Sequence, residues 1–165
     1  LATFATSPIE GRRFVNEIKP GEGAFVEFKQ SAFFNWKRFE SQPGASVGDL
    51  QSDEVTFALL KTIAAFLNSS GGKLFVGVKD DSTFCGIEKD LLYCKSHNED
   101  GWQLKIRDLI KGRFHDGDSI NNYIDVDLAP VEDSMIARIT VARRTKLSFL
   151  AGKHHYHLFC RQGNR

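Results

Sequence analysis

Four residues have side chains and a spacing that could support catalysis: Glu22, Glu27, Lys29 and Asp80. The glutamates lie five residues apart in "GEGAFVEFKQ", Lys29 shares the strand face of Glu27, and Asp80 follows the apolar run "KLFVGV". Because side chains alternate along a strand, the glutamates diverge unless the glycines on either side of Glu22 bend the chain. If the glutamates converge with Asp80, these carboxylates repel one another unless a cation lies among them, and oxygen ligands suit Mg²⁺ or Mn²⁺. Such a site supports phosphodiester cleavage, with Lys29 on the phosphate or against a carboxylate. The alternative is that these are surface acids at a turn and a strand edge.

Positive charge is concentrated at the C-terminal end of the chain. Residues 1–133 contain 15 Lys and Arg against 21 Asp and Glu, whereas residues 134–165 contain no acid. The basic residues of this end are Arg138, Arg143, Arg144, Lys146, Lys153, Arg161 and Arg165. Such a segment is typical of a surface that contacts a phosphate backbone. A solvated sheet edge protected by positive charge would show the same composition.

A mixed aromatic and basic run, "FFNWKRF", contains Lys37 and Arg38. Aromatic rings beside basic residues can stack bases and hold the phosphates of a single strand. The same rings could instead anchor a loop to the core.

A phosphate loop and a histidine metal site are both disfavoured. The glycines of "NSSGGK" follow a helix, so the turn faces the carbonyl end of that helix, which repels anions, and no nucleotide cofactor is predicted. In "KHHYH", Lys153, His155 and His157 share one face of an expected strand. A lysine neighbour and the lack of a third ligand indicate added positive charge rather than a metal site.

Length and composition predict a single domain. The chain has 165 residues, of which 41% are hydrophobic and 26% charged, and its net charge is +1. It has no apolar run of membrane-spanning length and no signal-peptide pattern. Cys85, Cys94 and Cys160 form no C-x-x-C pair, which favours a reducing, intracellular compartment, cytoplasmic or nuclear. Because the chain lacks an initial Met and stops at "CRQGNR", we expect a domain of a longer protein.

The first half of the chain is predicted to contain two helices and two strands. A capping pattern beginning at Ser7 predicts a helix that makes residues 1–19 an N-terminal segment, ahead of a domain over residues 20–165. A strand over residues 24–30 and a long loop over residues 31–52 follow. A second helix begins at Ser52 or Asp53, ends at a left-handed Gly71 or Gly72, and leads into the buried strand "KLFVGV".

The second half is predicted to contain one helix and three strands. The helix begins near residue 100, and the strands cover residues 122–128, 135–141 and 155–161. Together the elements predict an α+β domain, with a mixed sheet of about five to six strands covered by two to three helices.

Taken in order, three motifs resemble the Schlafen AlbA-like domain. They are "EGAFVEFKQ", then "IAAFLNSSGGKLFVGVKDD" with "CGI" after it, and finally "HLFCRQGNR". The resemblance covers residues 20–165 and implies binding of DNA or RNA by the basic residues. Some animal Schlafens are metal-dependent endoribonucleases that cleave transfer and ribosomal RNA. By resemblance, Glu22, Glu27 and Asp80 match their acids, so Mg²⁺ or Mn²⁺ and a structured RNA such as tRNA are implied. Lys79 departs from the pattern, because an acid often stands there.

The resemblance also bears on partners. Animal Schlafen cores pair two such lobes around an RNA duplex, whereas this chain supplies one, so a homodimer or a second lobe in the parent chain is implied. Two alternatives stay open: a non-catalytic DNA- or RNA-binding module of a regulator, and a protein-interaction domain. No membrane partner is predicted.

Overall fold

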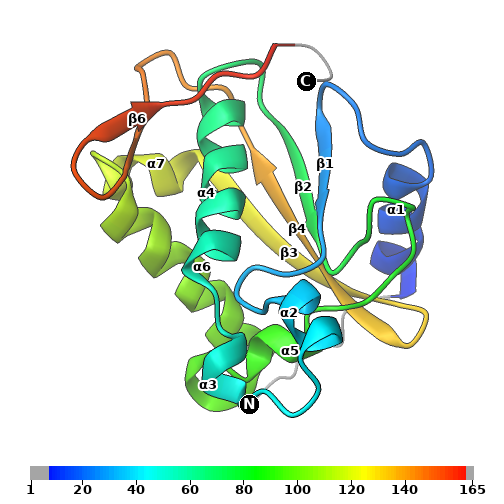
Figure 1. The fold of residues 1–165 in the computed structure, drawn as a ribbon. Coiled ribbons are helices and arrows are strands. Elements are labelled where there is room, and N and C mark those ends of the chain that lie inside the picture. The colour runs from blue at the N-terminus through cyan, green and yellow to red at the C-terminus, as the bar shows by residue number, and fades with distance from the viewer. Residues whose placement is uncertain (1–7, 163–165) are drawn as a thin grey trace.

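The computed structural model describes residues 8–162, in which the helices precede four consecutive strands at the C-terminal end (Figure 1). The helices are α1 (Pro8–Ile18), α2 (Trp36–Ser41), α3 (Val47–Leu50), α4 (Asp53–Leu67), α5 (Glu88–Leu91), α6 (Glu99–Arg113) and α7 (Gly117–Ile120), with 3-10 turns at Lys95–His97 and Asn121–Tyr123. The strands are β1 (Val26–Lys29), β2 (Gly72–Val76), β3 (Ile124–Val131), β4 (Ser134–Val141), β5 (Phe149–Ala151) and β6 (Tyr156–Leu158). No helix among residues 8–162 is long and apolar enough to cross a membrane. The predicted N-cap Ser7 and the basic Arg165 lie outside the described residues.

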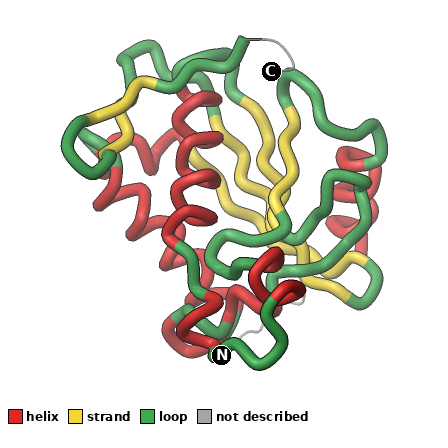
Figure 2. The backbone as a smooth tube through the Cα atoms, viewed as in Figure 1, coloured by secondary structure: helices red, strands yellow, loops and turns green. Residues whose placement is uncertain are grey.

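The main sheet has four strands in the order β1-β2-β4-β3. β1 and β2 are parallel, with Glu27 opposite Leu74, and the other neighbouring pairs are antiparallel. β1 is therefore an edge strand, and Figure 2 shows the sheet between helices on its two sides. β5 and β6 pair with each other as a separate antiparallel sheet. The predicted α+β class and mixed sheet are confirmed, with the six strands divided between two sheets.

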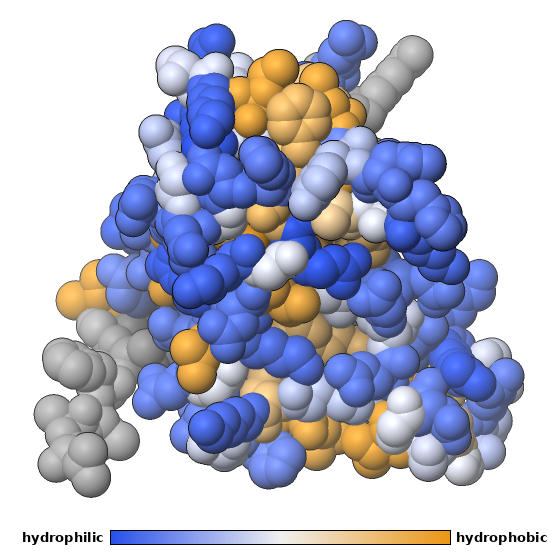
Figure 3. All heavy atoms as spheres, turned by 90° about the vertical axis from the view of Figure 1, so that its left-hand side faces the viewer, coloured by the Kyte–Doolittle hydropathy of each residue, from blue (hydrophilic) through white to orange (hydrophobic). Residues whose placement is uncertain are grey.

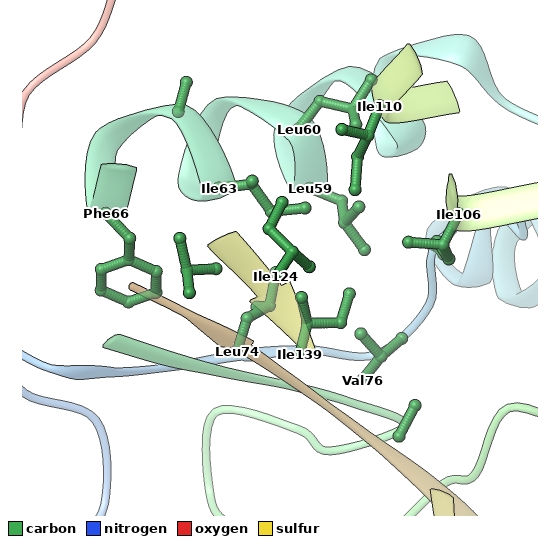
Figure 4. Packing of buried hydrophobic residues seen from close by; sticks show 14 of the residues in the cluster. Leu59, Leu60, Ile63, Phe66, Leu74, Val76, Ile106, Ile110, Ile124 and Ile139 are labelled. Carbon is green, nitrogen blue, oxygen red and sulfur yellow. The ribbon is translucent and has the colours of Figure 1, made fainter. Parts of the chain in front are cut away.

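Helix α4 covers one face of the main sheet. Its N-cap is Ser52, whose hydroxyl accepts a hydrogen bond from the Val55 N–H, and Gly71 follows its C-terminal end at a φ of +73°. Figure 4 shows side chains of α4 directed at those of β2, β3, β4 and α6. The buried residues labelled there are Leu59, Leu60, Ile63, Phe66, Leu74, Val76, Ile106, Ile110, Ile124 and Ile139. Burial of each such side chain stabilises the fold by about 1.5–3 kcal/mol.

Helix α1 covers part of the opposite face. The Phe14 ring packs edge-on against Phe75 of β2, with centroids 5.7 Å apart, and Ile18 is buried in the same cluster. A Cβ at Gly11 would collide with the carbonyl oxygen of Pro130, so glycine permits the close approach of α1 to β3. Helix α1, which falls within the predicted N-terminal segment over residues 1–19, thus packs against β3 of the main sheet.

The segment over residues 31–52, predicted to be a loop, contains α2 and α3. Local caps explain the difference, because the Asn35 side chain accepts from the Arg38 N–H and Ser46 forms a capping box with Asp49. The start of the segment is fixed by Asp90, which is 1% exposed and accepts hydrogen bonds from the backbone N–H groups of residues 32–34 and from the Trp102 indole. The aromatic run anchors this segment to the core, since Phe33 and Phe34 are buried.

The β5–β6 hairpin corrects the strand predicted over residues 155–161. The Gly152 N–H donates to the His155 carbonyl at 2.7 Å and closes a turn, so Lys153 and His155 lie in that turn rather than on a strand with His157. Figure 3 shows the side of the molecule on which β6 lies, where apolar side chains gather at the top of a mainly hydrophilic face. Leu147 and Leu158 are each about half-exposed.

Candidate nucleic-acid interface

Glu22 folds back along the edge of β1. Gly21 has a φ of +85°, which favours glycine, and the Gly23 N–H donates to the Val26 carbonyl at 2.9 Å. The chain therefore bends before β1, and the Glu22 Oε1 accepts a hydrogen bond from the Phe28 N–H at 2.7 Å. This N–H faces the unpaired edge of the strand, so the glutamate satisfies a group that would otherwise need water.

Glu27 is held between two cations. Its Oε1 accepts from the Lys29 ammonium at 2.7 Å, and its Oε2 accepts from the Arg161 guanidinium at 3.0 Å. Burial raises the pKa of this carboxyl, but the hydrogen bonds and charges of Lys29 and Arg161 outweigh burial and lower the pKa below its ordinary value. Glu27 is therefore ionised at neutral pH, with both oxygens engaged.

Arg161 ties the C-terminal segment to the start of β1. Its guanidinium also donates to the Gly23 carbonyl at 2.6 Å and lies 5.0 Å from the centre of the Phe66 ring. Its backbone N–H donates to the Ser69 hydroxyl at 2.7 Å. The side chain is 14% exposed. Segments more than a hundred residues apart in the sequence thereby meet at one place.

A groove of about 620 Å³ lies between β1, α4 and residues 159–161. Its walls carry Glu22 and Glu27 together with the cations Lys29, Lys61 and Arg161. The Lys61 ammonium lies 5.1 Å from the centre of the Phe159 ring, which lines the same groove. The arrangement combines positive charge with an aromatic surface, two features that bind a nucleic-acid strand.

Asp80 does not line this groove. It lies exposed in a turn closed by hydrogen bonds from the Lys79 N–H to Thr83 and from the Ser82 N–H to Lys79. Asp80 comes four residues after the end of β2, and it is not among the residues that line the groove with Glu22 and Glu27. Within residues 8–162, no three His, Cys, Asp or Glu side chains are placed to hold a metal ion.

The acids of the groove do not fit Mg²⁺ or Mn²⁺ as arranged. Both oxygens of Glu27 are paired with cations, one oxygen of Glu22 accepts a backbone hydrogen bond, and Asp80 is elsewhere. A divalent cation needs several unengaged oxygen ligands around one point. The expectation that Glu22, Glu27 and Asp80 converge is thus met for the glutamates, which line one groove, and not for the aspartate.

Two of the predicted phosphate-binding arginines are buried in ion pairs. The Arg138 side chain is 7% exposed and pairs with Glu17 of α1 and Asp127 of β3. The Arg144 side chain is 3% exposed and pairs with Asp116. Both guanidiniums are committed to acids distant in the sequence, which corrects the expectation that they face a phosphate backbone.

Apart from Arg161, the other predicted basic residues within residues 8–162 are exposed, but they do not form one surface. Lys37 and Arg38 lie on or beside the first turn of α2, and Figure 1 places α2 at the end of the molecule opposite the C-terminal segment. Arg143, Lys146 and Lys153 lie around the β5–β6 hairpin, and the Lys146 ammonium pairs with Asp116 at 3.0 Å.

Sequence reasoning missed Lys61 and Phe159. Phe57 and Lys61 are four residues apart and therefore lie on one face of α4. Both contact the Phe159 ring. The signal available in the sequence was a lysine on the same face of a predicted helix as an aromatic residue.

Comparison with known proteins identifies the class. The chain matches the family described as Schlafen, AlbA_2 over residues 22–165, and it belongs to that family. No curated protein matches the chain.

Two solved structures are similar in fold. The first is the N-terminal domain of a Nitrosomonas europaea protein described as related to the ATP-dependent DNA helicase RecG. It has a TM-score of 0.50 and 14% identity, covering 93% of this chain and 86% of that one. The second is a Corynebacterium diphtheriae protein, with a TM-score of 0.48 and 20% identity over 81% of this chain. This chain spans 24% of the length of the Corynebacterium protein.

Proposed function

We propose that this domain binds nucleic acid through the groove between β1, α4 and residues 159–161. The observation that carries the proposal is the convergence of Lys29, Lys61 and Arg161 beside the Phe159 ring. Ammonium and guanidinium groups contact phosphates without regard to sequence, and an aromatic face accepts any base. Membership of the Schlafen AlbA_2 family supports the same reading. An intracellular location, cytoplasmic or nuclear, is part of the proposal because such a partner is met there.

The charges of the groove favour a single strand over a duplex. Two carboxylates lie among the cations, so the groove is less positive than the walls that usually track duplex phosphates. The aromatic ring is useful only to an unpaired base, because the faces of paired bases are covered by their neighbours.

Lys61→Ala tests the groove. Fluorescence anisotropy with a labelled single-stranded RNA and the matching DNA, over a range of salt concentrations, measures both affinity and its salt dependence. We expect Lys61→Ala to weaken binding about 3- to 10-fold and to reduce the salt slope by about 0.7, the value for one phosphate contact on a single strand. The control is Lys111→Ala, because Lys111 is 63% exposed on α6 and pairs with Asp118 away from the groove. Equal losses in both variants would indicate a general charge effect and argue against the groove.

A second candidate is divalent-metal-dependent cleavage of structured RNA such as tRNA. The specific observation in its favour is that Glu22 and Glu27 line one groove with Lys29. The test is incubation of labelled tRNA with Mn²⁺ or with EDTA, beside Glu27→Ala and Asp80→Ala. Metal-dependent products that disappear in both variants support cleavage. Intact tRNA under every condition leaves nucleic-acid binding as the function.

Assembly belongs to the same proposal. A single lobe with one groove contacts one side of a structured RNA, so a homodimer or a second lobe of the parent chain would be needed to enclose it. Sedimentation of the domain with and without RNA tests this, and a stable monomer in a one-to-one complex would contradict the homodimer. A domain that binds no nucleic acid at low salt would instead point to a protein partner.

A further inference from the structure

A second pocket adjoins the groove across Phe159. It has a volume of about 660 Å³, within the range of pockets that hold small organic groups. One wall is the first turns of α4, which contribute Asp53, Glu54 and Phe57, and the other is the turn and second strand of the β5–β6 hairpin. The histidines of "KHHYH" line this pocket, and neither the groove nor the proposed phosphate contacts use them.

The hairpin wall carries a row of aromatic rings. His155, His157 and Phe159 are two residues apart, with ring centres separated by 6.0 Å and 5.8 Å, and the last pair is stacked at 27°. A base inserted between two rings needs about 7 Å, twice the stacking distance of about 3.4 Å, so a ligand would stack on the exposed side of the row. Phe57 closes the row from α4, because its ring meets Phe159 edge-on at 6.2 Å.

A glycine fixes the position of the His157 ring. A Cβ at Gly152 would collide with this ring, so the absence of a side chain there allows the imidazole to lie flat against the hairpin turn. The turn itself is closed by the hydrogen bond from the Gly152 N–H to the His155 carbonyl. The aromatic wall is therefore built by the hairpin geometry.

The rim of the pocket offers donors and acceptors together. The Arg113 guanidinium donates to the Asp53 carboxylate at 3.0 Å, and Asp53 is 80% exposed, so part of that carboxylate faces solvent. Lys153 and Glu54 lie on the same rim. A base edge presents both donors and acceptors, whereas a phosphate presents acceptors alone and would be repelled by the two acids.

We propose that this pocket holds one unpaired nucleobase of a strand whose phosphates lie in the neighbouring groove. Phe159 joins the two sites, because Lys61 approaches its ring from the groove side and His157 stacks on it from the pocket side. The base packs against His155 and His157, whose rings lie at 69° to each other, so that it stacks on one ring and meets the other edge-on while its own edge meets Asp53 and Arg113. This inference rests on the proposed function and adds a base-contacting site to it.

The test compares two labelled single strands of equal length and charge, one with bases and one with abasic sugars throughout. The intact domain is expected to bind the base-bearing strand about 5- to 150-fold more tightly, since stacking contributes that range per base. His157→Ala and Phe57→Leu are expected to bring this ratio close to one without changing the affinity for the abasic strand. Gly152→Ala, which displaces the His157 ring, should act in the same direction. The control is His115→Ala, because His115 contacts Tyr156 of the hairpin and does not line the pocket.

Each outcome decides a separate point, with thermal unfolding of every variant confirming that it is folded. Equal binding of both strands by the intact domain overturns the base pocket and the stacking of a base on Phe159, and leaves the phosphate contacts of the groove standing. A ratio that survives His157→Ala and Phe57→Leu also overturns the pocket. Absence of binding to either strand overturns the proposed function together with the pocket. If free adenosine monophosphate competes as well as the strand does, the pocket is a nucleotide site and the link to the groove is wrong.

Discussion

Replacing Glu27 by glutamine should change stability and binding in opposite directions. Glu27→Gln keeps the shape of the side chain and removes the charge that Lys29 and Arg161 share at 2.7 Å and 3.0 Å. The fold loses two charge-assisted hydrogen bonds, while the groove keeps its cations and becomes more positive. A residue that served only stability, or only binding, would not separate the two measurements in this way.

The expected changes in unfolding free energy and in affinity follow from the partial burial of these three side chains. The Glu27, Lys29 and Arg161 side chains are 21%, 28% and 14% exposed, so we expect a loss of about 1–2 kcal/mol in the free energy of unfolding. A phosphate on the far side of Arg161 lies about 6 Å from Glu27, because each charged contact spans about 3 Å. Removing the repulsion at that distance in water contributes about 0.7 kcal/mol without screening and about 0.3 kcal/mol at physiological salt, which is about 2- to 3-fold tighter binding.

Acid titration gives the sign of the stability effect independently. The pKa of Glu27 is lowered in the fold from an ordinary value of 4.5. Its contribution to stability is therefore fully present above the unfolded pKa and is lost as the pH falls through the folded pKa. The stability difference between the wild-type protein and Glu27→Gln should be constant near neutral pH. It should begin to shrink as the pH falls below the ordinary value of 4.5, and it should disappear only below the lowered pKa of the folded protein.

Urea unfolding at several pH values and anisotropy at low salt measure the two effects. Glu22→Gln is the matched control for stability, because the Glu22 carboxylate accepts its hydrogen bond from the Phe28 N–H, which a glutamine carbonyl can also accept. Because Glu22 lines the same groove, this variant should also tighten binding, but without the loss of stability. If Glu27→Gln weakened binding to RNA while the protein remained folded, the carboxylate would itself contact the ligand or a cation. The assignment of Glu27 as a partner of Lys29 and Arg161 would then be wrong.

Three further predictions concern the fold. Asp90→Ala should lower the free energy of unfolding by at least about 3 kcal/mol in urea titrations, because several buried N–H groups lose their acceptor, and an effect below 1 kcal/mol would contradict this account. Gly11→Ala should lower the melting temperature by several degrees, since its Cβ meets the Pro130 carbonyl, and an unchanged melting temperature would show that α1 can shift freely. Thiol labelling should modify the exposed Cys160 at once and Cys94 only on unfolding, because Cys94 is buried and burial raises its pKa to about 11. Labelling of both cysteines at the same rate would refute the packing of α5 against α6.

The elements with strong periodicity could be predicted from the sequence, and those fixed by distant contacts could not. Helix α4 begins after its predicted cap, and the predicted left-handed Gly71 follows its C-terminal end, because both signals are local. The segment over residues 31–52 depends on Asp90, which is more than fifty residues away and accepts the backbone hydrogen bonds that fix its start. Its helices are each only a few residues long, too short for a periodic pattern to form.

The candidate site was predictable to the extent that it depends on neighbours in the sequence. Glu22, Glu27 and Lys29 come together because the glycine turn and β1 position them within eight residues. A count of charges along the chain contains no information on the acids that Arg138 and Arg144 contact across the fold. Both arginines were therefore predicted to lie on the surface. The position of Asp80 after a strand was visible in the sequence, but the turn from Lys79 to Thr83 that holds it outside the groove was not.

The Arg161–Glu27 ion pair determines how the groove responds to salt. The paired Arg161 and Glu27 side chains bring almost no net charge to a strand, so a phosphate that contacts Arg161 releases fewer condensed counterions than one that contacts an unpaired cation. Lys61 lies against the Phe159 ring and forms no ion pair within residues 8–162, so its contact with a phosphate contributes fully to the salt slope. Substitution of Lys61 or of the exposed hairpin cations should therefore change the salt dependence of binding. Substitution of Arg161 should instead change mainly the affinity at a fixed salt concentration. The same pair keeps Glu27 from any other ligand, so cleavage chemistry at this site would first require the C-terminal segment to release β1.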